Sequence, residues 1–150
     1  MTQPSVSLRP VRRDDANELA ELRVIAMRPS LEAIGRFDHQ RSRTRFLDAF
    51  DPELTREVVV AGNRIGFVVV RSVEEHLLLD HIYIQPPAQG SGIGSEVLKL
   101  VIAEARSAKK VLRLCALKQS ASNAFYMKHG FKLQSVSDWD NYYELAPSEA

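Results

Sequence analysis

An apolar stretch that runs straight into a glycine-rich segment constrains the fold of this chain most. Leu77–Ile84, with the sequence LLLDHIYI, is apolar enough to form a central strand. Pro86 and Pro87 lack the amide hydrogens that a strand ladder needs, so this strand is expected to end before them. The segment AQGSGIGSE follows, and an apolar helical face then runs to about Lys109. The residues of that face are Val97, Leu98, Val101, Ile102 and Ala105. The pattern predicts a strand, a loop and a helix in direct succession.

Further strands and helices are predicted on both sides of this unit. Before it, the expected elements are a strand over Val6–Pro10, a helix from Asp14 that ends at Pro29, a helical stretch over Leu31–Phe50, and a hairpin of Thr55–Ala61 and Ile65–Val73 that turns at Gly62-Asn63. After it, they are a strand over Val111–Leu117, a helix over Ser120–Lys128, and strands around Phe131–Val136 and Tyr142–Leu145. The order βααβββαβαββ predicts an α/β or α+β domain, with a mixed sheet of about six or seven strands and about four helices.

The composition bounds the size and the partners of the protein. A chain of 150 residues with 45% hydrophobic content suffices for one packed core, so residues 1–150 are expected to form a single domain. The formal net charge of +1 gives no long-range attraction to nucleic acid or to an anionic membrane. No apolar run approaches the roughly 20 residues that span a bilayer, and the N-terminal residues lack the apolar stretch of a signal peptide. We therefore expect a cytoplasmic protein with no nucleic-acid or membrane partner.

Three glycines between the predicted strand and helix indicate an anion site. Gly90, Gly92 and Gly94 lack Cβ atoms, so the backbone can approach an anion where unpaired N–H groups and the helix dipole favour negative charge. A Walker loop would need a lysine where Ser95 stands, and a dinucleotide fingerprint would need the spacing G-x-G-x-x-G. Neither requirement is met. The pattern favours a phosphate or pyrophosphate ligand, and an ordinary glycine connection is the alternative.

Two short motifs in this region match those of a known family. Residues 89–94, QGSGIG, fit a phosphate loop of the form Q/R-x-x-G-x-G/A at every fixed position. Asn123, the pair Phe125-Tyr126 and the pair Gly130-Phe131 fit a second motif, one helix and one strand further on. With these motifs the chain resembles the GNAT superfamily of N-acetyltransferases, most specifically over Leu77–Phe131. The resemblance implies a GNAT-like fold, acetyl-coenzyme A (acetyl-CoA) as co-substrate, no metal, and transfer of an acetyl group to a small-molecule or peptide amine.

The resemblance also implies a set of cofactor-binding residues. They are Ile82, Ile84, Gln89, Gly90, Ser91, Gly92, Ile93, Gly94, Ser95, Gln119, Asn123 and Phe125. Family members often carry an asparagine seven residues before the tyrosine of the second motif, but in this chain Gln119 stands there. Asn123 lies three residues before Tyr126, so either amide is a candidate for the contact with CoA. Homodimers are common in the family, and a homodimer is one expected assembly.

Acetyl transfer from a thioester to an amine needs a base, a donor for the carbonyl oxygen and an acid for the departing thiolate. The resemblance assigns the acid to Tyr126, for which aromatic packing is the alternative, and the carbonyl contact to the backbone N–H of Ile84. Asp80 stands four residues before Ile84, where several relatives carry an acidic residue that faces the amine, and we expect it to be the base. His81 is the rival base on the opposite face of the strand, and a structural pair with an arginine is the alternative for Asp80.

The other reactive or charged residues are expected to have structural roles. Cys115 lies inside the apolar strand Val111–Leu117, where a thiol should fill the core rather than carry an acetyl group. The four histidines and Cys115 show no metal-ligand spacing. The arginines at positions 36, 41, 43 and 45 should lie on a solvated helix face, with an acidic-substrate site as the alternative. A non-catalytic acyl-CoA-binding or sensing domain is the competing function, and Tyr126 favours the enzyme.

Overall fold

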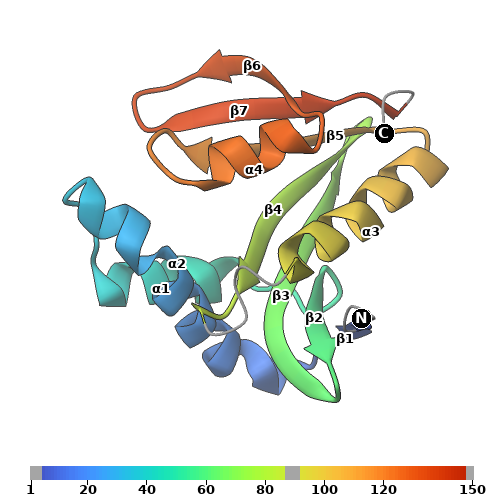
Figure 1. The fold of residues 1–150 in the computed structure, drawn as a ribbon. Helices are drawn as coiled ribbons and strands as arrows, with labels where there is room; N and C mark the ends of the chain where they lie inside the picture. The colour runs from blue at the N-terminus through green and yellow to red at the C-terminus, as the bar shows by residue number, and fades with distance from the viewer. Residues whose placement is uncertain (1–4, 87–91, 148–150) are drawn as a thin grey trace. The chain divides into compact units, whose positions relative to one another are not determined.

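The computed structural model describes residues 5–86 and 92–147, and the elements follow the predicted order (Figure 1). The first elements are β1 (Val6–Pro10), the short 3-10 helix η1 (Arg13–Asp15), α1 (Ala16–Ala33), α2 (His39–Ala49), β2 (Thr55–Val60) and β3 (Asn63–Val73). The later ones are β4 (His76–Ile84), α3 (Ile93–Ser107), β5 (Val111–Leu117), α4 (Ser122–Lys128), β6 (Lys132–Val136) and β7 (Asp140–Leu145). The predicted order βααβββαβαββ is therefore confirmed.

The strands of the described residues form one hydrogen-bonded sheet in the order β1-β2-β3-β4-β5-β7-β6. β1 and β2, β2 and β3, β5 and β7, and β6 and β7 pair antiparallel. β4 and β5 are parallel, and their ladder joins His76–Leu78 to Val111–Arg113. Parallel neighbours need a long connection, which α3 supplies. The predicted mixed pairing is confirmed.

The chain divides into two compact units. The first unit holds the residues up to Val69 together with His81–Val97. The second unit holds Val70–Asp80 together with the residues from Leu98 onward. Strands β3 and β4 and helix α3 each contribute residues to both units.

The core of the first unit lies where α1 and α2 pack on each other and on β3 (Figure 1). Leu19 and Ala20 of α1, Phe46 of α2, and Phe67 and Val69 of β3 are all buried there. The rings of Phe46 and Phe67 meet edge to face with their centroids 5.3 Å apart. Removal of such apolar surface from water is the main force that holds helices on a strand.

In the second unit, α4 contacts β5, beside which β7 and β6 run (Figure 1). Leu112, Leu114 and Ala116 of β5 are buried, as one face of a strand with alternating side chains should be. The predicted apolar face of α3 is also buried, including its residues Leu98 and Val101 in this unit.

The first helix continues past Pro29, where the sequence predicted its end. α1 ends only at Ala33. A proline removes the hydrogen bond to the carbonyl four residues earlier, which is that of Ile25. Ile25 is 54% exposed, so water can reach this part of the helix. The helix therefore tolerates the proline at the loss of one internal bond.

The predicted helical stretch over Leu31–Phe50 is also corrected. α2 covers only His39–Ala49, and residues 31–33 belong to α1. Gly35 has a φ of +68°, which ends helical geometry and which glycine adopts without a steric penalty. Asp38 then caps α2, because its Oδ1 accepts a hydrogen bond of 2.9 Å from the N–H of Arg41.

Two expectations from the sequence stay predictions, namely the single domain over residues 1–150 and the cytoplasmic location. In the part of the chain that the structure describes, every helix is too short or too polar to cross a bilayer.

Candidate active site

The end of the predicted phosphate loop lies at the start of α3. Gly92, the residue directly before the helix, has a φ of +84°, a left-handed conformation that favours glycine. Its carbonyl accepts a hydrogen bond of 3.1 Å from the N–H of Glu96, which closes the first helical turn. The first N–H groups of a helix have no acceptor within it and lie at the positive end of its dipole. This terminus therefore has the geometry and the field that suit a phosphate.

The other predicted loop residues fall into two groups. Gln89, Gly90 and Ser91 lie outside the described residues. Ile93, Gly94 and Ser95 already belong to α3. Gly94 is thus helical, so the absence of its Cβ contributes room at the helix start rather than an unusual dihedral angle.

Strand β4 carries Ile82 and Ile84, which were both predicted to bind the cofactor, and both are half-buried. β3 lies very close to this end of β4. A Cβ added to Gly66 would sit 2.2 Å from the carbonyl oxygen of Tyr83 and 3.2 Å from the Cα of Ile84. Backbone atoms cannot give way by that much, so only glycine fits at position 66. Gly66 thereby fixes the path of β4 at Ile84.

Asp80, the residue expected to act as the base, forms an ion pair. Its Oδ2 accepts a hydrogen bond of 2.7 Å from Nε of Arg71, and about a third of each side chain is exposed. This contact matches the structural alternative that the sequence left open for Asp80. The pair lies within the second unit.

His81, the rival base, has aromatic surroundings within the first unit. Its Nδ1 lies 3.0 Å from the hydroxyl oxygen of Tyr83, in a part-buried hydrogen bond. Its ring meets those of Phe46 and Tyr83 with centroid distances of 5.7 and 5.5 Å. Phe67 completes the cluster, 5.3 Å from the Tyr83 ring. Packing on several sides, together with the hydrogen bond between Nδ1 and the Tyr83 hydroxyl, fixes the position of the imidazole.

Tyr126, the predicted acid, is 6% exposed in the second unit. Its ring packs against those of Phe125, Phe131 and Tyr143 at centroid distances of 5.4, 5.8 and 6.3 Å. The aromatic packing that the sequence left open as an alternative is therefore present. Packing of the ring and use of the hydroxyl are compatible, because the rings hold the phenol in a fixed position.

Asn123 has a side-chain amide that is fully engaged within the second unit. Its Nδ2 donates to three backbone carbonyls at 2.8 to 3.2 Å, those of Leu117, Lys118 and Ser120. Its Oδ1 accepts from Nδ2 of Asn141 at 3.0 Å and from the hydroxyl of Tyr143 at 2.8 Å. An amide group offers two donors and one oxygen acceptor with two lone pairs, and these contacts use all of them.

Gln119, the other candidate amide, differs from Asn123 in exposure. It lies in the turn between β5 and α4 and is exposed to solvent. Phe125 is half-buried, and its ring packs 5.1 Å from that of His129. Of the two residues, Gln119 is exposed and Asn123 is half-buried.

Cys115 does not fill the core, and this corrects the sequence-based expectation. It lies on the exposed face of β5, between the buried residues Leu114 and Ala116. Loss of hydration around the sulfur raises the pKa of the thiol, and the negative charges of Asp140 and Asp80 raise it further. The thiol therefore stays protonated and weakly nucleophilic at neutral pH.

Arg64 of β3 joins three carboxylates in the first unit. Its Nε, Nη1 and Nη2 each donate at 2.7 Å, to Glu57, Glu18 and Asp15 respectively. The side chains of Arg64, Asp15 and Glu57 are about one-fifth exposed. The pKa of Asp15 is lowered, first by the backbone N–H of Arg12 and then by Arg64. We refer to these four side chains as the Arg64 network.

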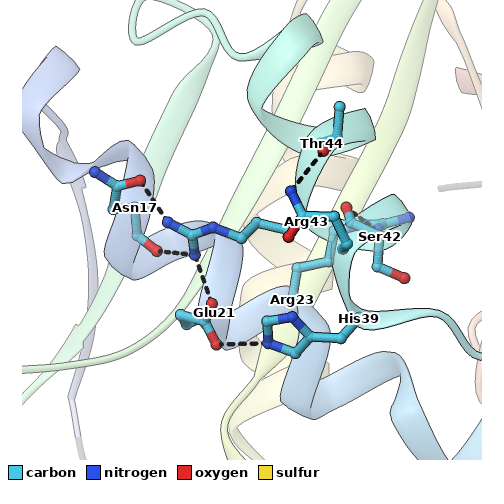
Figure 2. A network of polar contacts seen from close by, with 8 residues as sticks. Asn17, Glu21, Arg23, His39, Ser42, Arg43 and Thr44 are labelled. Carbon is cyan, nitrogen blue, oxygen red and sulfur yellow. Dashed lines mark hydrogen bonds and ion pairs between the residues drawn. The ribbon is translucent and has the colours of Figure 1, made fainter.

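Arg43 of α2 forms a second charged network with α1 (Figure 2). Its Nη1 donates to Oε1 of Glu21 and its Nη2 to Oδ1 of Asn17, both at 2.5 Å. The other carboxylate oxygen of Glu21 lies 3.4 Å from Nε2 of His39. Arg43 thus joins the two helices, and its contacts show that this arginine does not lie on a solvated face.

A pocket of about 710 Å³ opens between these two networks, within the first unit. Its charged and polar lining comes from Asn17, Glu18, Glu21, Arg43, Arg64 and Gln85. Leu22 and Ile25 of α1 and Pro86 after β4 supply the apolar lining. Across residues 5–86 and 92–147, no three His, Cys, Asp or Glu side chains are grouped so that they could hold a metal ion.

Three residues near the candidate site were not predicted from the sequence, namely Gly66, Tyr83 and Arg64. A lone glycine inside a strand is a known sign of close backbone approach, so Gly66 could have been found. Tyr83 follows His81 by two residues, which places both on one face of a strand, and this spacing could have paired them. The three partners of Arg64 are 7, 46 and 49 residues away, and no local pattern predicts them.

Comparisons with known proteins identify the family and the fold. The sequence model of the family described as "Acetyltransferase (GNAT) domain" matches residues 55–133, more than half of the chain.

The structure is similar to the PaiA N-acetyltransferase from Thermoplasma acidophilum in complex with coenzyme A, with a TM-score of 0.79, 18% identity, and coverage of 95% of this chain and 99% of that one. It is also similar to an acetyltransferase from Thermus thermophilus, with a TM-score of 0.76 and 16% identity. The match covers 97% of this chain and 99% of that one. A third similar structure is the ribosomal-protein-S18-alanine N-acetyltransferase from Escherichia coli, with a TM-score of 0.73 and 18% identity. The match covers 97% of this chain and 96% of that one. These structures share the fold, and curated protein sequences gave no match.

Proposed function

Because the chain belongs to the GNAT family of acetyltransferases, we propose that it transfers an acetyl group from acetyl-CoA to an amine by direct attack within a ternary complex. The observation that carries the proposal is the start of α3, where the left-handed Gly92 precedes a helix N-terminus inside the residues that match the family. The bound thioester supplies the activated acetyl group. All other requirements of the reaction fall to side chains and backbone groups of this chain.

The phosphates of the co-substrate would be held at the start of α3. The N–H groups of Ile93, Gly94 and Ser95 lie in the first turn of this helix, where the helix dipole favours an anion. A glycine at position 92 takes the left-handed backbone without strain and puts no side chain in the way of a phosphate. These features support the fit of a pyrophosphate to this chain.

Gln119 is our choice for the side-chain amide that contacts CoA. Asn123 uses its amide nitrogen and oxygen on five groups of the protein, so a contact with CoA would break internal bonds. Gln119 is exposed and stands seven residues before Tyr126. In this proposal Asn123 shapes the turn after β5, and Gln119 reaches the ligand.

Two groups would serve the thioester end. The backbone N–H of Ile84 would donate to the carbonyl oxygen as negative charge develops there. Tyr126 would give its proton to the departing thiolate, a transfer that is not steeply uphill because phenols and alkyl thiols have similar acidity. The aromatic rings around Tyr126 support this role, because they fix the position of the phenol.

We propose His81 as the base that takes the proton of the amine, in place of Asp80. The carboxylate of Asp80 is engaged by Arg71. His81 is held in place by aromatic rings and by the hydrogen bond between its Nδ1 and Tyr83. His81→Gln should lower kcat/KM by about 10²-fold and abolish its low-pH limb, whereas Asp80→Asn should change it less than about threefold. The reverse pattern would return the role to Asp80.

Turnover in the presence of an amine tests the proposal. The wild-type protein is mixed with acetyl-CoA and a panel of primary amines, and free CoA thiol is followed. We expect CoA release that depends on the amine, and in Tyr126→Phe a rate lower by about 10²-fold with unchanged acetyl-CoA affinity. Gly92→Val should weaken acetyl-CoA binding in a calorimetric titration. Tight binding of acetyl-CoA without turnover of any amine would favour the non-catalytic sensing domain.

A further inference from the structure

The pocket between the Arg64 network and Arg43 has walls whose positive charges are already neutralised. All three nitrogens of the Arg64 guanidinium donate to carboxylates. Arg43 donates through both terminal nitrogens, to Glu21 and Asn17 (Figure 2). An anion would have to displace these internal partners, which makes the pocket a poor receptor for phosphate or carboxylate groups.

The two networks together carry an excess of negative charge. Four carboxylates face the guanidiniums of Arg43 and Arg64, and they belong to Asp15, Glu18, Glu21 and Glu57. His39 reduces the excess only when it is protonated. Glu18 is 78% exposed and Glu21 is 46% exposed, so both carboxylates are accessible at the pocket wall. The local field therefore favours a cation.

Apolar residues supply most of the remaining lining. Leu22 and Ile25 lie one helical turn apart on α1, and Pro86 faces the same space from the segment after β4. Ile25 is 54% exposed, so an apolar ligand can cover its side chain. Carboxylates beside an aliphatic wall suit a ligand with a cationic head and an apolar body.

The position of the pocket connects it to the proposed chemistry. Gln85 and Pro86, which line it, directly follow Ile84 at the end of β4. The N–H of Gln85 donates to the carbonyl of Ile65 at 2.8 Å, so this end of the wall is tied to β3. The pocket thus adjoins the strand that carries the backbone group assigned to the thioester.

We propose that this pocket binds the acceptor as an organic ammonium with an apolar body, through Glu18 and Glu21 at its charged wall and Leu22 and Ile25 at its apolar wall. The inference rests on the proposed function, since it names the class of amine that the enzyme would acetylate. It excludes acceptors whose amine is flanked by a carboxylate, because the pocket offers that group an unfavourable field.

Binding of three probes that share one carbon chain tests the inference without catalysis. Hexylamine, 1-hexanol and hexanoate are titrated calorimetrically into the wild-type protein, with and without CoA. We expect saturable binding of hexylamine, binding of 1-hexanol weaker by about tenfold, and hexanoate weaker still, because a charge-assisted bond contributes roughly that factor. Equal affinity for hexylamine and hexanoate, or no saturable binding of the amine, would overturn the inference.

Paired variants locate the binding at this pocket. Glu18→Gln with Glu21→Gln should weaken hexylamine binding by about tenfold, and Ile25→Ser by about threefold. Glu74→Gln with Glu75→Gln removes the same number of charges at the exposed turn between β3 and β4 and should leave binding unchanged. If the first double variant loses stability, Glu18→Gln alone remains a test, because that side chain is largely exposed. Unchanged hexylamine affinity in Glu18→Gln would overturn the inference.

Kinetics separate a failure of this inference from a failure of the proposed function. If amines are acetylated but Glu18→Gln and Ile25→Ser leave KM for hexylamine unchanged, the proposed acetyl transfer is supported and the pocket is not the acceptor site. If hexylamine binds in a way that needs Glu18 but no amine releases CoA, the proposed transfer fails and the pocket's preference for amines stands.

Discussion

The Arg64 network in the first unit and the Asn123 contacts in the second satisfy polar groups in opposite ways. Arg64 joins three carboxylates and leaves the surrounding wall negatively charged. Asn123 joins five neutral groups and leaves no donor or acceptor of its amide unused. A saturated neutral network stabilises a turn and is unavailable to a ligand, whereas an unbalanced charged network beside a pocket selects the charge of what binds there.

Loss of the Asn123 amide should have the largest effect on stability. Asn123→Ala leaves three carbonyls and two side-chain groups without their partner, and we expect the free energy of unfolding to fall by about 2–4 kcal/mol. Tyr143→Phe removes one of these bonds and should cost about 1 kcal/mol. Urea unfolding monitored by circular dichroism measures both. A loss below about 1 kcal/mol in Asn123→Ala would contradict the structural role and return Asn123 to the cofactor site.

Loss of Arg64 should have the next largest effect. Arg64→Met leaves Asp15 and Glu57, both largely buried, without their common partner, and we expect a loss of about 2 kcal/mol. Arg113→Met, which breaks the half-exposed pair with Glu144, is the matched control and should cost less than about 1 kcal/mol. Equal losses in the two variants would mean that the Arg64 network is an ordinary surface cluster.

Salt should distinguish the two networks. At about 1 M salt the Debye length falls to about 3 Å, so part of the deficit of Arg64→Met should disappear. The deficit of Asn123→Ala should stay the same, because its bonds join neutral groups. Urea unfolding of both variants at low and high salt measures the difference. A salt-dependent deficit in Asn123→Ala would contradict the assignment of its partners.

Acid should weaken the first network through Asp15. Its pKa is lowered in the folded protein, so its contribution is present above the unfolded value of about 3.9 and is lost as the pH falls through the folded pKa. The free energy of unfolding should therefore decline below about pH 4 in the wild type and less so in Asp15→Asn. Urea unfolding as a function of pH measures this decline, and parallel curves for the two proteins would refute the coupling.

Local patterns predicted most of the fold. The bounds of β1 and β5, Val6–Pro10 and Val111–Leu117, are those that the sequence predicted, because alternation and the flanking residues define a strand locally. The predicted end of α1 at Pro29 was wrong. The free-energy cost of a proline depends on whether the part of the helix that loses a hydrogen bond is open to water, and this exposure cannot be derived from the sequence. The exposure of Cys115 could have been predicted, since Arg113 lies on the same face of β5.

The site was less predictable than the fold. The motif matches located the start of α3 and the second motif at Asn123 and Tyr126, but they could not assign a role to Asn123. Two of its partners, Asn141 and Tyr143, lie 18 and 20 residues away on β7 and become neighbours only through strand pairing. The ion pair of Asp80 with Arg71 likewise depends on tertiary structure, although the sequence had left that pairing open.

The smallest expected effect concerns Cys115. Because desolvation and two nearby carboxylates raise the pKa of its thiol, alkylation by iodoacetamide should be slower at neutral pH than that of a free cysteine and should rise steeply at alkaline pH. Cys115→Ser should keep full acetyl transfer. Mass spectrometry of the alkylated protein measures the rate, and rapid reaction at neutral pH would contradict the assigned environment.

The fate of the acetyl group tests direct transfer most directly. Wild-type protein in excess over acetyl-CoA with a labelled acetyl group is quenched at short times, with and without hexylamine, and both the protein and the amine are analysed by mass spectrometry. With the amine present, we predict label on the amine in step with CoA release, and at no time on the protein. Label that appears on the protein before the amine, at Cys115 or elsewhere, would contradict the account.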